Sequence, residues 1–113
     1  MIYTAIALFA LAAILGMFLL SFILRNKETP KAFALIHGPL AATGLVLLII
    51  YYFNHGAGPL ESIILFAIAA LGGIVLFSRD IVHKPVPKWL AIVHGLVAVT
   101  GFIFLLIFAF AGK

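Results

Sequence analysis

Four long apolar stretches, separated by short polar segments, dominate the pattern of hydrophobic and polar positions. They cover about 2–24, 31–53, 59–77 and 88–110, and each approaches or exceeds the roughly 20 residues that an α-helix needs to cross a bilayer. The apolar character is continuous and does not alternate at every second residue, which favours helices over a β-barrel. With short connections between successive helices, the pattern predicts an all-α transmembrane protein, an up-down-up-down four-helix bundle.

The second half of the chain repeats the first after a shift of 57 positions. Residues 8–50 align with residues 65–107 without a gap, with 19 identities in 43 pairs. This indicates a tandem duplication of a two-helix unit, with repeats at about 1–57 and 58–113 inside one domain, 1–113. Because each unit holds an even number of helices, both enter the membrane in the same sense, and the pseudo-two-fold axis is expected along the membrane normal.

Composition supports a bilayer as the surroundings of this chain. Of 113 residues, 66% are hydrophobic and 9% are charged, whereas apolar residues make up about half of a soluble domain. Cysteine is absent, which excludes disulfides, thiolate metal sites and dithiol redox chemistry. Any redox work therefore needs a bound cofactor.

The basic residues predict the orientation. Six of the seven lie in or beside the first and third connections, and the seventh ends the chain: Arg25, Lys27, Lys31, Arg79, Lys84, Lys88 and Lys113. The positive-inside rule then places these two connections in the cytoplasm and both termini outside, as in a multi-pass protein of a bacterial inner membrane. This topology accounts for the net charge of +4. Nucleic-acid binding is not expected, since no recognition module accompanies the charge.

A histidine motif occurs once in each repeat. His37 begins the segment HGPLAATG, and His94 begins HGLVAVTG at the equivalent position. Histidine inside hydrocarbon is costly and tends to mark function. Each lies six residues beyond the lysine that begins its helix, which is about 9 Å into the membrane. The second and fourth helices share a diagonal of the predicted bundle, so the two imidazoles can face each other across the core.

Small residues surround both histidines on their helix faces. The positions at −3, +4 and +7 hold Ala34, Ala41 and Gly44 in the first repeat and Ala91, Ala98 and Gly101 in the second. Such a face leaves a slot for a flat macrocycle, and a haem iron held by two imidazoles is one of the ligation types of helical bundles. Gly16 and Gly73 could let the other two helices approach the ring, and Lys31 and Lys88 could meet its propionates.

The four-helix layout with these two histidines resembles small membrane b-type cytochromes, cytochrome b561-like in the broad sense. The resemblance implies one haem b bound to His37 and His94, electron transfer with quinone or another redox protein as partner, and, if the chain is an enzyme, a membrane haem oxidoreductase. Proteins of that class commonly carry two histidine pairs, whereas this chain has one pair in its apolar stretches. Electron transfer across the whole bilayer by this chain alone is therefore not expected.

Other functions remain open on the same residues. The histidines can serve helix packing through hydrogen bonds, bind a bare metal ion, or relay protons. The chain can equally be a small transporter or channel, or a structural subunit of a larger complex. The oligomeric state is open as well. His55 and His83 are expected to be solvated histidines of the connections.

Two polar details give local expectations. Thr29 and Pro30 predict a helix start with a hydroxyl N-cap and proline in the first turn. Pro39, well inside the second helix, predicts a bend just past His37. Ser21 and Ser78 are candidates to accept a hydrogen bond from the imidazoles or to bond back to their own helices.

Overall fold

The computed structural model describes residues 1–111 and is helical along almost the whole of that length; Lys113, which entered the charge pattern, lies outside the described residues. The helices are α1 (Ile2–Leu24), α2 (Lys31–His55), α3 (Leu60–Ile81) and α4 (Lys88–Ala111). No strand occurs in the described range. The all-α class is confirmed. The start and end of α1 match the prediction, while α3 ends about one turn later than its apolar stretch.

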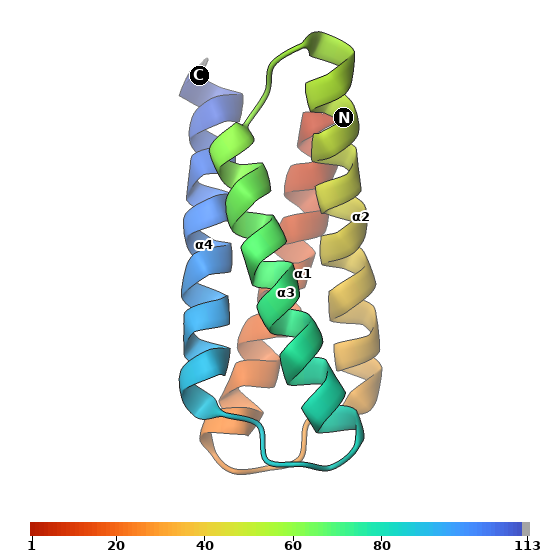
Figure 1. The fold of residues 1–113 in the computed structure, drawn as a ribbon, viewed down its shortest axis with the longest axis vertical. Coiled ribbons are helices and arrows are strands. Elements are labelled where there is room, and N and C mark those ends of the chain that lie inside the picture. The colour runs from red at the N-terminus through yellow and green to blue at the C-terminus, as the bar shows by residue number, and fades with distance from the viewer. Residues whose placement is uncertain (112–113) are drawn as a thin grey trace.

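The four helices form an up-down-up-down bundle (Figure 1) measuring 43 × 19 × 19 Å. Helix α1 packs against α2 and α4, and α3 packs against the same two helices. Thus α1 and α3 share one diagonal and α2 and α4 the other, as predicted. The connections 25–30 and 82–87 lie at one end, here called the basic end, while both terminal helix ends and the connection 56–59 lie at the opposite end.

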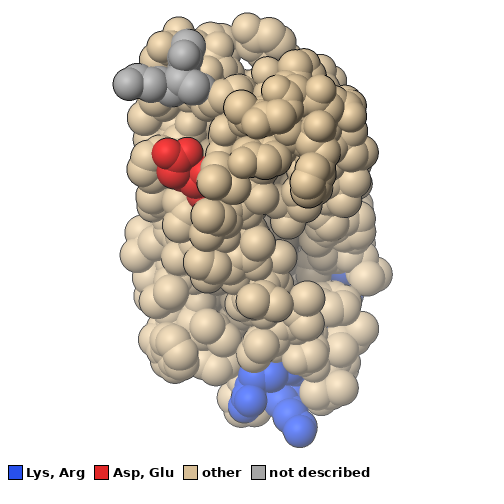
Figure 2. Space-filling view, turned by 45° about the horizontal axis from the view of Figure 1, so that its top comes forward, with Lys and Arg blue, Asp and Glu red and all other residues tan. Residues whose placement is uncertain are grey.

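The outer surface of the bundle is suited to lipid. Each helix is long and apolar enough to cross a membrane, since even the shortest, with 22 residues, spans about 33 Å at 1.5 Å per residue. Large apolar side chains such as Ile14, Leu71 and Phe110 are exposed. Figure 2 shows Lys and Arg atoms gathered mainly at the basic end and, above it, a broad surface that is uncharged except for one acidic patch. The protein is therefore a multi-pass membrane protein.

The core is built from equivalent residues of the two repeats. Phe9 of α1 and Phe66 of α3 stack across the bundle with ring centroids 3.8 Å apart and planes 5° from parallel. Leu48 and Leu105, also equivalent after the 57-residue shift, are both completely buried. Helix α2 continues through Pro39 without interruption. The duplicated sequence thus produces duplicated packing in the middle of the bundle.

Candidate functional site

His37 and His94 come together between the helices, as the sequence predicted. They project from the diagonal helices α2 and α4, and their ring centroids are 6.3 Å apart with the planes at 78°. Both rings are partly buried. The duplication alone does not bring the rings together. Helices α2 and α4 must also turn toward each other the faces that carry His37 and His94.

Each imidazole is held by a backbone carbonyl of the neighbouring helix. His37 Nδ1 lies 2.7 Å from the carbonyl oxygen of Ala12, and His94 Nδ1 lies 2.7 Å from that of Ala69. A carbonyl can only accept, so Nδ1 carries the proton and donates it. In the neutral ring, Nε2 then keeps a free lone pair, and this nitrogen is the atom that can bind a metal.

The serines play no part in this arrangement. Ser21 donates to the carbonyl of Phe18 at 2.6 Å, and Ser78 donates to that of Val75 at 2.8 Å. Both therefore bond back to their own helices, which was the alternative expectation. Sequence reasoning missed the alanine carbonyls because a backbone acceptor leaves no mark in residue identity.

Glycine allows each ring to lie directly against the neighbouring helix. A Cβ at Gly16 would stand 2.9 Å from His37 Cε1, and a Cβ at Gly73 would stand 3.0 Å from His94 Cε1. Real Cβ atoms seldom or never come so close to other atoms, so a larger residue at either position would require the ring to shift. The two predicted glycines thus do lie at the histidines, where they set the position of the rings.

Some of the remaining small residues lie farther along the bundle axis, at the Phe9–Phe66 pair. Gly44 and Gly101 lie against the rings of Phe9 and Phe66, with built Cβ distances of 2.8 and 3.3 Å to those side chains. Ala41 packs against the core cluster that contains Phe9 and Phe66. The Phe9–Phe66 pair therefore bounds the histidine site on the side away from the basic end. Of the others, Ala91 is buried and Ala34 and Ala98 are partly buried.

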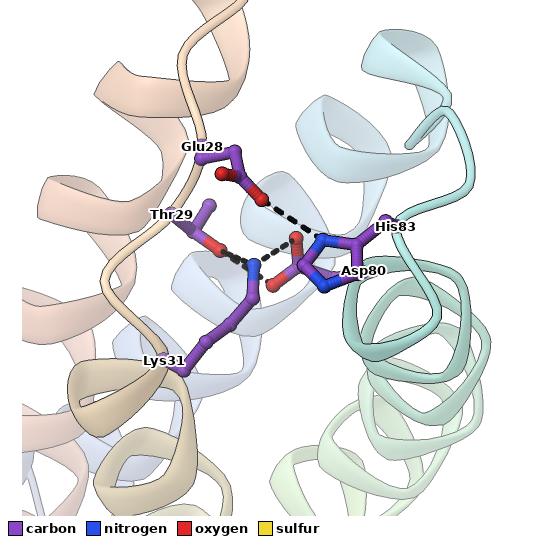
Figure 3. Close-up of polar contacts among 5 residues, drawn as sticks. All are labelled: Glu28, Thr29, Lys31, Asp80 and His83. Atoms are coloured by element: carbon purple, nitrogen blue, oxygen red, sulfur yellow. Dashed lines mark hydrogen bonds and ion pairs between the residues drawn. The ribbon is translucent and has the colours of Figure 1, made fainter.

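Polar side chains close the basic end on one side of the bundle (Figure 3). Lys31 forms a 3.0 Å ion pair with Asp80 of α3, and the hydroxyl of Thr29 donates to the other oxygen of that carboxylate. Lys31 also donates to the hydroxyl of Thr29 at 3.1 Å. We call Thr29, Lys31 and Asp80 the latch. Beside it, His83 lies 2.9 Å from a carboxylate oxygen of Glu28.

The latch shows that the expected N-cap role of Thr29 is wrong, and it gives Lys31, which was assigned to a propionate, a partner within the protein. Thr29 is not the N-cap of α2: Pro30 holds that position with no side-chain cap, and the helix begins at Lys31. Of the two lysines assigned to propionates, Lys31 is engaged by Asp80, whereas Lys88 is exposed. His55 and His83 are exposed as expected, but His55 is the last residue of α2 and does not lie in a connection.

The donor set within residues 1–111 is small. No group of three or more His, Cys, Asp or Glu side chains there could hold a metal ion. Comparison of the chain with known protein families, with curated proteins and with solved structures finds no match. Function therefore has to be argued from the imidazole pair itself.

Proposed function

We propose that this protein is a membrane cytochrome that binds one haem b between His37 and His94. The observation that carries the proposal is the twin hydrogen bond from Nδ1–H to a backbone carbonyl. Histidines that ligate metals almost always donate their other ring N–H in this way, which fixes the tautomer and makes the ligating nitrogen more basic.

The number of donors favours haem over a bare metal ion. Structural zinc takes four protein ligands and catalytic zinc three, whereas the histidine site provides two side-chain nitrogens. Haem iron is already held by its porphyrin, so the two imidazole nitrogens of His37 and His94 would be enough to hold it. The two rings, with centroids 6.3 Å apart, lie close enough to hold one group between them.

In this proposal the residues of the chain bind and orient the cofactor. His37 and His94 hold it through Nε2, Gly16 and Gly73 leave room for the imidazoles, and Lys88 pairs with a propionate at the basic end. Bound haem supplies reversible one-electron oxidation and reduction. Quinone or another redox protein would be the electron partner, and the bacterial inner membrane, with the basic end in the cytoplasm, would be the location.

The test of haem ligation uses the purified protein reconstituted with haem. Wild type should give a six-coordinate low-spin spectrum. His37→Ala and His94→Ala should each give a five-coordinate high-spin spectrum or lose the haem, because each removes one axial ligand. His55→Ala and His83→Ala are matched controls and should leave the spectrum unchanged.

Two results would reject the proposal. One is a wild-type protein that binds no haem under any reconstitution condition, which would make hydrogen-bonded helix packing the better account of the histidines. The other is a low-spin spectrum that survives in both His37→Ala and His94→Ala.

The proposed orientation has a separate test. Alkaline phosphatase fused after Lys113 should be active, since it folds only outside the cytoplasm, and a fluorescent cytoplasmic reporter at the same place should be dark. The opposite result would place the basic end, and the histidines near it, at the outer face.

A further inference from the structure

The two seams between the repeats differ at the basic end. Each repeat is a helical hairpin, and the hairpins meet along the α2–α3 seam and the α1–α4 seam. The latch closes the α2–α3 seam. At the α1–α4 seam the position equivalent to Asp80 is Ile23 and the position equivalent to Thr29 is Val86, so Lys88 meets no comparable partners there.

The latched seam is also the one with the least helix packing. Helices pack most closely within each hairpin, less closely between α1 and α4, and least between α2 and α3. In lipid, association of helices depends on such packing and on polar contacts, because the surrounding acyl chains are as apolar as the helices. The α2–α3 seam therefore depends on the latch more than the opposite seam depends on any polar contact.

The latch lies between the basic end of the bundle and the histidine pair. Lys31 begins α2, and His37 follows six residues later on the same helix. A cavity of about 270 Å³ lies between the two connections, with Thr29, Asp80 and His83 in its lining. Farther in, Gly16 and Gly73 lie against the partly buried imidazoles, so α1 and α3 leave a broad planar molecule little room beside the rings.

We propose that the α2–α3 seam is the gate of the histidine site and that the latch holds it shut. The identity of the ligand rests on the function proposed above, but the gate concerns access to the imidazoles whatever they bind. A planar ligand with carboxylates, as haem has, offers Lys31 a replacement for Asp80. Such a ligand would exchange one ion pair for another as it enters, and the latch would re-form once the ligand carboxylate has passed Lys31.

The first experiment measures access without haem. Ligand-free protein in detergent is treated with diethyl pyrocarbonate, which modifies imidazole nitrogens, and labelling is mapped by mass spectrometry with exposed His55 as internal reference. Asp80→Ile, which places the residue of the equivalent position in the latch, should raise labelling of His37 and His94 several-fold. Lys88→Gln, which changes the equivalent lysine, should leave it at the wild-type level. Equal labelling in wild type and Asp80→Ile, or an equal rise in Lys88→Gln, would overturn the gate.

The second experiment locks each seam with an engineered disulfide. Because the chain has no cysteine of its own, only the introduced pair can form a disulfide within the chain. In oxidised Thr29→Cys/Asp80→Cys protein, labelling of the paired histidines should fall below wild type and haem uptake should stop, and reduction should restore both. Oxidised Ile23→Cys/Val86→Cys protein, locked at the opposite seam, should behave as wild type. Unimpaired access in the first variant, or a block by the second lock alone, would contradict the proposal.

The two proposals can fail separately. If wild-type protein takes up no haem, the proposed function is rejected, while labelling of the imidazoles still decides whether the seam is a gate. If haem binds but labelling and uptake ignore the latch, the cytochrome stands and the gate is rejected.

Discussion

The histidine layer, formed by His37, His94 and the residues that contact them, follows the two-fold repeat of the chain, whereas the basic end does not. In the histidine layer the hydrogen bond of the imidazole occurs twice: His37 with Ala12 repeats as His94 with Ala69, at the same 2.7 Å. At the basic end the latch occurs once, and the equivalent of Asp80 is apolar. The hydrogen bonds of the histidine layer follow the two-fold repeat, while the latch does not.

The surroundings explain this difference. Inside the bundle a buried polar group without a partner costs about 1–3 kcal/mol, and close contacts leave no room for a larger residue, so most changes in one repeat are unfavourable. At a water-facing end the solvent satisfies polar groups, and an exposed ion pair is worth only about 0.2–1 kcal/mol. Residues there can diverge, and divergence allows the two seams to take different roles.

The largest effect should come from filling the space beside the imidazoles. Gly16→Leu and Gly73→Leu should each lower the free energy of unfolding by about 3 kcal/mol or more, since the added side chain must displace a ring that is bonded to a carbonyl. Gly38→Leu is the matched control, because a Cβ there meets nothing within 4 Å. Denaturation in mixed detergent micelles, followed by circular dichroism, measures all three. Similar losses in all of them would show that the histidine layer is not specially constrained.

The phenylalanine layer offers a finer comparison between the repeats. Gly44→Ala places a Cβ 2.8 Å from the Phe9 ring, whereas Gly101→Ala places one 3.3 Å from Phe66 and Leu65. Overpacking should cost the first variant roughly 1–2 kcal/mol. The second should be close to neutral, because alanine favours the helix over glycine by up to about 1 kcal/mol. The same unfolding assay applies, and a larger loss at Gly101 would mean that the two layers are not packed as described.

Removal of the latch should have a smaller effect on stability than on access. Asp80→Ile should lower the free energy of unfolding by about 1 kcal/mol, because the carboxylate is only 16% exposed but its partners lie near water. High salt should shrink the difference from wild type, since salt screens the lost ion pair. Lys88→Gln should leave the free energy of unfolding of the ligand-free protein at the wild-type value. A loss that is independent of salt would point to packing instead of charge.

The smallest effect is expected where one repeat carries a polar atom that the other lacks. Ser62 is completely buried and its hydroxyl has no hydrogen-bond partner among residues 1–111, while the equivalent Ala5 is equally buried. Ser62→Ala should raise the free energy of unfolding by up to about 1 kcal/mol, because it removes an unsatisfied hydroxyl. Ala5→Ser should lower it by a similar amount. A destabilised Ser62→Ala protein would reveal a partner for that hydroxyl.

Much of the architecture could be predicted from the sequence because its signals are local. Continuous apolar stretches determine which segments cross the membrane, and short connections determine which helices are neighbours. The repeat determines that His37 and His94 share a depth and a diagonal. Even the phenylalanine pair had a visible signal, since Phe9 and Phe66 lie in the repeated segment LFA, although no rule of spacing said that they would stack.

Only the tertiary structure decided what these side chains touch. The acceptors of the imidazoles are carbonyls of Ala12 and Ala69, which no side chain identifies. Thr29 lies 51 residues from Asp80 in the chain and bonds to it across the α2–α3 seam instead of capping its own helix. Helix periodicity gives the direction of a residue on one helix, but the rotation of two helices against each other depends on packing all four together. The partners across a seam therefore follow from the assembled bundle.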